Sequence, residues 1–427
     1  MSRPTRTFGV LLAAVLLAGP AIRGFAESAG GSTAHPAPLT LADCYALALK
    51  QSETLAIHQE LITQAEARFT QALSGILPRA SFVSTDKRQD GSGSSAFTLK
   101  QVPERKFTFS QPLFSGFREF AAMAGTKAER RQRMLEKTRA EQLLFVDVAN
   151  AFYLVLEQQK DLAVLAVIQR ALTDRVEELT AREQIGRSRP SEVVSAEAQR
   201  LRLEADLELA RAQDVIARQL LGFLTGLDQI ESLQDLALPP LAEENPYLAK
   251  AVNRPDIGAV QAAAQVAEHQ VDVAKADRWP TVSLGGNYYL ERVGNAKDIT
   301  WDATLTVDVP IFQGGQTRGA IAQAASQARQ ATLVAAEARR RAILEVRDAY
   351  ASARAALARR DALATAAAAS EEDYRLQVDD YRRSLVNNLE VLQTLQVLEA
   401  ARRDLLHAEY EAKRQYWHLR AAVGDLA

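Results

Sequence analysis

The sequence predicts a mainly α-helical protein with a membrane β-barrel to which each chain contributes four strands. Three observations predict this fold class. The second half of the chain repeats the first, each half has a proline-free helical stretch of about 65 residues, and each half has two segments that alternate polar and apolar residues. The repeated order is helix, strand pair, very long helix, helix.

The N-terminus is a targeting segment. Arg3 and Arg6 precede an apolar run of about eleven residues, too short to span a bilayer, and the small residues Gly24 and Ala26 flank Phe25 as in a cleavage site. Residues 1–26 are therefore predicted to be a secretory signal peptide. Leu17-Ala18-Gly19 is followed directly by Pro20 rather than by a cysteine, so an N-terminal lipid is not predicted.

The duplication is visible in short matching motifs. Pro112 and Pro310 lie in similar motifs 198 positions apart, and Leu77-Pro78 matches Trp279-Pro280 at an offset of 202. The length difference lies between these markers, as expected for a variable hairpin loop. The predicted domains are repeat 1, a linker or equatorial segment, and repeat 2, over residues 27–227, 228–247 and 248–427.

Helical spacing first appears over about 40–75, with Thr40 as the predicted N-cap, and Pro78 ends it. The long helix of the first half covers about 116–184, and its counterpart covers about 317–380. At 1.5 Å per residue, the first helix and the one over about 190–226 together match the long helix in length. We therefore expect two shorter helices stacked end to end beside each long helix. Arg254-Pro255-Asp256 is interpreted as a structural helix start.

Alternation with a period of two predicts hairpins over about 79–113 and 280–310, with Pro112 and Pro310 ending their strands. Strands of about ten residues with one apolar face are typical of outer-membrane barrels, although two soluble hairpins packed on helices would give a similar pattern. Four strands cannot close a barrel in lipid. Two chains would supply eight strands and three chains twelve, and only the larger barrel leaves a pore, so a duct favours three subunits.

Composition excludes several function classes. Lys plus Arg number 51 against 53 Asp plus Glu, which argues against a nucleic-acid-binding surface. The single cysteine and five scattered histidines predict no metal site, and no cofactor motif is present. Without a catalytic motif either, the protein is not expected to be an enzyme.

The order of these features resembles one known family. The signal peptide, the duplication, LTLADCYALALKQS at 39–52, RPDI at 254–257, and the paired QPLFSG and VPIFQGG resemble the TolC family of bacterial outer-membrane efflux proteins. The resemblance covers about 38–424. It implies a homotrimer with a twelve-stranded barrel in outer-membrane lipid and a periplasmic α-helical barrel. It also implies partnership with a periplasmic adaptor and an inner-membrane pump.

The resemblance further implies where a gate lies. The family's constriction lies at the second helix–helix turn, with a tyrosine before it and two carboxylates three residues apart after it. Tyr381 and Glu390 match this pattern, but Gln393 replaces the second acid. The adaptor-contact residues implied at the two turns are Gly186, Arg187 and Ser188, and Ser384, Leu385 and Val386.

The function that follows is a trimeric exit duct of a tripartite efflux or type I secretion system. Two alternatives are a periplasmic adaptor-like protein and a structural coiled-coil protein. An adaptor would need one helical hairpin flanked by β domains rather than a whole-chain duplication, and a plain coiled coil would lack the paired strands.

Overall fold

The structure is a computed structural model that describes residues 38–90 and 99–425. The predicted signal peptide and most of the first hairpin loop lie outside the described residues. In chain order, the elements are α1 (Leu41–Gln51), α2 (Glu53–Leu73), the 3₁₀ turn η1 (Ser74–Ile76), β1 (Arg79–Arg88), β2 (Gln101–Ser115), α3 (Arg118–Gln184), α4 (Pro190–Thr225), α5 (Glu244–Ala251), α6 (Pro255–Ala276), β3 (Thr281–Arg292), β4 (Trp301–Asp308), α7 (Gln316–Arg382) and α8 (Asn388–Val423).

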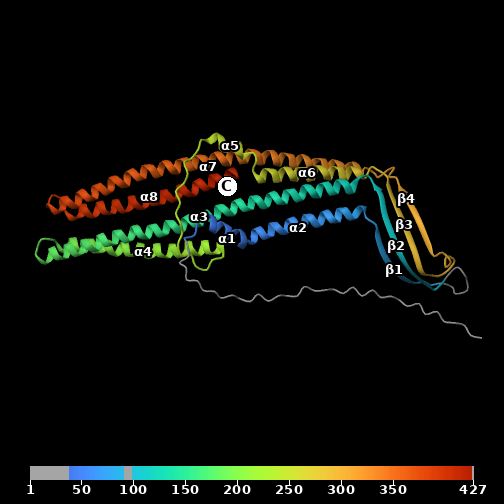
Figure 1. Cartoon of the computed structure of the whole chain (residues 1–427), viewed down its shortest axis with the longest axis horizontal. Helices are drawn as coiled ribbons and strands as arrows, with labels where there is room; N and C mark the ends of the chain where they lie inside the picture. The colour runs from blue at the N-terminus through green and yellow to red at the C-terminus, as the bar shows by residue number, and fades with distance from the viewer. Residues whose placement is uncertain (1–37, 91–98, 426–427) are drawn as a thin grey trace, which may run out of the picture. The chain divides into compact units, whose positions relative to one another are not determined.

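Two long helices, α3 and α7, organise the helical part. Each has 67 residues, which corresponds to about 100 Å. Helices α2 and α4 pack along α3, and α6 and α8 pack along α7, while α3 also contacts α6 and α8 (Figure 1). The predicted stacking of two shorter helices beside each long one is therefore confirmed.

The core follows the coiled-coil spacing of α3. Leu165, Ile168, Leu172 and Leu179 recur at intervals of three, four and seven and are all buried against α4 and α8. A second cluster, around Phe152, joins the middle of α3 to α1 and α8, and it contains the fully buried Cys44.

The helix predicted over about 40–75 is not continuous in the structure, which divides it into α1 and α2. The capping box of Thr40 and Asp43 is present, but the helix breaks at Ser52. The backbone of Ser52 is extended, and its hydroxyl accepts a hydrogen bond from the Leu55 backbone N–H, so that this residue ends α1 and begins α2. A serine hydroxyl can bond to a nearby backbone group in place of the regular helical hydrogen bonds. The helical spacing of apolar residues does not reveal such a break.

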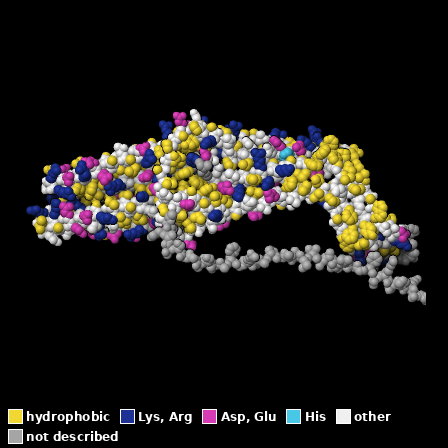
Figure 2. All heavy atoms as spheres, in the orientation of Figure 1, with side chains coloured by type: hydrophobic (Ala, Val, Ile, Leu, Met, Phe, Trp, Pro, Cys, Tyr) yellow, Lys and Arg dark blue, Asp and Glu magenta, His cyan; other side chains and the backbone are white. Residues whose placement is uncertain are grey.

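The four strands form one antiparallel sheet in the order β1-β2-β3-β4. The two predicted hairpins are therefore joined edge to edge through β2 and β3. The prediction that Pro112 ends its strand is wrong, because β2 continues to Ser115, with an irregular register between Pro112 and Phe114. A proline without an N–H is tolerated inside a strand at such an irregularity. Hydrophobic side chains gather over the sheet (Figure 2).

A segment between α4 and α5 crosses the helices as a strap. Its Ser232 and Gln234 make backbone hydrogen bonds with Leu39, and its Asp235 accepts hydrogen bonds from Tyr410 and Lys413 of α8. Helix α5 begins at Glu244, inside the segment 228–247 that the sequence assigns to a linker.

Candidate functional site

The two helix–helix turns implied by the family pattern lie at the same end of the helices, away from the sheet (Figure 1). The first follows α3 and has Gly186 in the left-handed region, and the second follows α7 and has Ser384 there. Ser188 is half-buried and donates a hydrogen bond to Glu192. Of the other residues implied to contact an adaptor, Val386 is half-buried, and Gly186, Arg187, Ser384 and Leu385 are exposed. Contact of these residues with an adaptor stays a prediction.

Tyr381 lies in a buried cluster just inside these turns, and it is only 8% exposed. The guanidinium of Arg175 stacks 3.8 Å from the ring centroid, and that of Arg182 lies 4.7 Å away. Arg175 Nε donates a 2.8 Å hydrogen bond to Oδ1 of Asn388, which is 2% exposed. We call Arg175, Tyr381 and Asn388 the tip cluster, because it joins α3 to both ends of the second turn.

Glu390 and Gln393 do not belong to this cluster. Asn387 caps α8: its Oδ1 accepts a hydrogen bond from the Glu390 backbone N–H, and its Nδ2 donates one to the Glu390 carboxylate. Gln393 is exposed. Glu390 is therefore paired with the N-cap residue Asn387. A role for Glu390 in a constriction stays a prediction.

Sequence reasoning missed Arg175 and Asn388. The signal was available for Arg175, because this residue continues the buried spacing of Ile168, Leu172 and Leu179, where an apolar side chain is the norm. A charged residue at such a core position requires a partner. The sequence does not reveal that the partner is Asn388, 213 residues away.

A second set of charged residues joins α3 to α8 nearer the middle of the helices. Glu157 is 5% exposed and accepts hydrogen bonds from His407, at 2.6 Å, and from Arg414. Asp161 is 1% exposed and accepts two hydrogen bonds from Arg403, at 2.8 and 2.9 Å. We call Glu157 and Asp161 the seam acids. Both are paired, as buried carboxylates must be.

His407 makes this seam sensitive to pH. The hydrogen bond to Glu157 raises the pKa of His407 above 6.5, although burial opposes the shift. A raised histidine pKa stabilises the fold below about pH 6.5, and this stabilisation is lost as the pH rises through the folded-state pKa. Burial would raise the pKa of Glu157, but His407 and Arg414 hold it below 4.5, so its contribution is lost only in acid.

We expect the wild-type protein to lose stability as the pH rises above about 6.5, and His407→Gln to flatten this dependence. The effect should stay below about 1 kcal/mol, because the His407 side chain is 43% exposed and solvent screens it. Urea unfolding followed by circular dichroism in detergent measures it. An equal pH slope in both proteins would contradict the assignment to His407.

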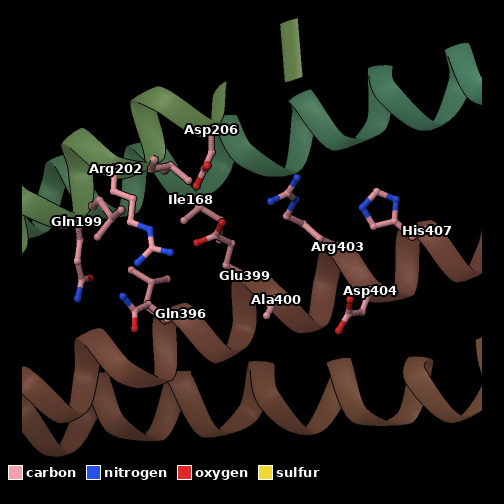
Figure 3. A pocket seen from close by; sticks show the side chains of 13 residues that line it. Ile168, Gln199, Arg202, Asp206, Gln396, Glu399, Ala400, Arg403, Asp404 and His407 are labelled. Atoms are coloured by element: carbon pink, nitrogen blue, oxygen red, sulfur yellow. The ribbon is translucent and has the colours of Figure 1, made fainter. Parts of the chain in front are cut away.

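A groove of about 620 Å³ lies between the seam acids and the tip cluster. Helices α3 and α4 form one wall of the groove and α8 forms the other. Figure 3 shows Arg202 and Asp206 on the α4 side, facing Glu399 on the α8 side. Burial raises the pKa of Glu399. Polar side chains join α3 to α8 on both sides of the groove, at the seam acids and at the tip cluster. Between these two positions, the groove separates α3 and α4 from α8.

The sheet has two chemically different faces. On one face, Asn287 bridges Thr108 and Asp302, and Tyr289 donates a 2.8 Å hydrogen bond to Asp302. The opposite face is exposed and mainly apolar, with Asp86 and Arg88 near its loop end, and its large side chains include Phe82, Phe107, Phe109, Leu284, Tyr288, Trp301, Leu305 and Val307. An exposed apolar face of this size suits contact with lipid.

Within 38–90 and 99–425, no group of three His, Cys, Asp or Glu side chains is placed to hold a metal ion. Across the same ranges, no helix has both the length and the apolar character needed to cross a membrane.

Comparisons with known proteins agree with this architecture. The profile of the family described as "Outer membrane efflux protein" matches residues 247–425. The chain is 26% identical over 359 residues to the cation efflux system protein CusC of Escherichia coli K12, which covers 78% of this chain and 77% of CusC. The crystal structure of the outer membrane protein VceC of Vibrio cholerae superposes with a TM-score of 0.78 at 20% identity, covering 90% of this chain and 96% of VceC. The Campylobacter jejuni CmeC outer membrane channel gives a TM-score of 0.79 at 16% identity, covering 90% and 85% of the two chains.

Proposed function

We propose, from the premise that this chain belongs to the TolC family of outer-membrane efflux proteins, that three copies form a continuous exit duct through the outer membrane and into the periplasm. The four-stranded sheet is the observation that supports this proposal most strongly. It has an apolar outer face, and its edge strands β1 and β4 pair with no further strand of the described chain. Three such sheets supply twelve strands, enough for a closed barrel with a pore.

The helices form the periplasmic part of this duct. Helices α3 and α7 are equal in length, and so are α4 and α8 with 36 residues each. This equality supports a duplication in which residues 27–227 and 248–427 are repeats joined by 228–247. Three chains would place six long helices around one axis.

The duct is passive in this proposal. An inner-membrane pump supplies the substrate and the energy, and a periplasmic adaptor joins the pump to the turns at Gly186 and Ser384. The tip cluster closes the periplasmic end by fixing α7 and α8 against α3. Three Glu390 carboxylates then attract cations to the constriction. In an adaptor-like or purely structural protein, the apolar face of the sheet would have no lipid to contact and would remain exposed to water.

Membrane fractionation and light scattering in detergent test this proposal. We expect the mature protein in the outer-membrane fraction with the mass of a trimer, and we expect it to conduct ions in planar bilayers. A soluble periplasmic monomer would overturn the proposal, because four strands would then have to serve without a shared barrel.

A further inference from the structure

The two edges of the sheet carry opposite charges on the same face. Residues that face each other across an antiparallel sheet share a face, so the pairing places Arg79 and Lys87 of β1 on the polar face, together with Asp302 and Asp308 of β4. Both edge strands thus have a charged residue near each end of this face, basic on β1 and acidic on β4.

Three of these four residues have no ion-pair or hydrogen-bond partner among the described side chains: Arg79, Lys87 and Asp308. Asp302 is held by Asn287 and Tyr289, which fix its carboxylate on the polar face. All ten residues of β1 are exposed. The edges are therefore open, and their charges are free to meet a neighbour.

The direction of the strands makes the two edges complementary. Strand β1 leaves the helices at Arg79, and β4 returns to them at Asp308. When two copies stand side by side with their helices on the same side, β4 of one copy runs antiparallel to β1 of the next. Asp308 then lies near Arg79 at the helical end, and Asp302 near Lys87 at the far end.

We propose that these acid–base pairs set the register between subunits, with Asp302 of one copy directly opposite Lys87 of the next. This inference rests on the shared barrel of the proposed function and adds its subunit contact. All eight residues of β4 are paired in this register. Asp308 lies opposite Ser81, within diagonal reach of Arg79.

The other face of the sheet favours the same register. It places Trp301 opposite Arg88 and Val307 opposite Phe82, which are a cation–aromatic pair and an aromatic–β-branched pair. A shift by two residues would instead place Trp301 opposite Asp86. A shift by one would turn the charged residues to the lipid face, which costs far more.

Cysteine cross-linking of the full-length chain tests the register. In a Cys44→Ala background, Thr85→Cys with Thr304→Cys places the two thiols directly opposite each other across the proposed contact, so we expect disulfide-linked dimers and trimers. Ser81→Cys with Thr304→Cys is the matched control, because Ser81 lies on the same face four residues from Thr85 and its thiol should be too far from position 304 to react. Cross-linking of the control pair, or of Val83→Cys with Thr304→Cys in preference to the Thr85 pair, would overturn the proposal.

Charge reversal tests the pairing itself. Arg79→Asp and Asp308→Arg should each lower the trimer fraction in detergent by about five-fold, and the double variant should restore it. A double variant no better than either single one would overturn the pairing. Light scattering separates this outcome from failure of the proposed function: a wild-type trimer with a different register contradicts only this inference, whereas a wild-type monomer contradicts the duct.

Discussion

Replacing Arg254 by alanine should lower the free energy of unfolding by about 2–3 kcal/mol, because its carboxylate partners Asp256 and Glu345 are 38% and 43% exposed and solvent screens part of the loss. The Arg254 side chain is 2% exposed. Its guanidinium donates two hydrogen bonds to Asp256 and one each to Glu345 of α7 and the Ala422 carbonyl of α8. The side chain therefore joins the start of α6 to two other helices. Its removal leaves a buried carbonyl and two carboxylates without their main partner.

The pKa of Asp256 reports the same contact. Burial would raise this pKa, but the hydrogen bonds and charge of Arg254 outweigh burial and hold it below 3.8. Arg139 lies 3.9 Å from Asp256 and offers this carboxylate a second cation, which favours the lower end of the range.

Urea unfolding in detergent, followed by circular dichroism, measures the loss. Arg354→Ala is the matched control, because Arg354 is exposed on α7, and its effect should stay within about 0.5 kcal/mol. Arg254→Lys should fall between the two, since an ammonium cannot reproduce the forked geometry. A loss below about 1 kcal/mol for Arg254→Ala would show that the contact is dispensable.

Replacing Arg175 by alanine should open the periplasmic end of the duct. The substitution removes the bond to the buried Asn388 and the stacking on Tyr381, together worth about 2–3 kcal/mol in each subunit. A loss of this size shifts a closed-to-open equilibrium by more than about ten-fold. Single-channel recording in planar bilayers should show the open level occupied more often.

Three further variants separate the contributions within the tip cluster. The contacts of Tyr381 run through its ring, so Tyr381→Phe should behave as wild type and Tyr381→Ala should resemble Arg175→Ala. Arg170→Ala, on an exposed position of the same helix, is the control. Unchanged conductance for an intact Arg175→Ala trimer would remove the tip cluster from the gate.

The sequence by itself determined the local elements of this protein. The period of the apolar residues, the prolines and the turn residues predicted both long helices and both helix–helix turns to within a few residues. The alternation of polar and apolar residues predicted all four strands. These features depend on neighbours within one or two turns of chain, so they can be read directly from the sequence.

Only the tertiary structure decided which distant side chains meet. Asp161 and Arg403 are 242 residues apart, and Arg175 and Asn388 are 213 apart. Such pairs depend on the rotation and stagger of α8 against α3, which many apolar contacts set together. The joining of the two hairpins through β2 and β3 depends in the same way on how the helices bring them side by side. A periodic pattern fixes which face of an element is buried, but packing against the partner element fixes what that face meets.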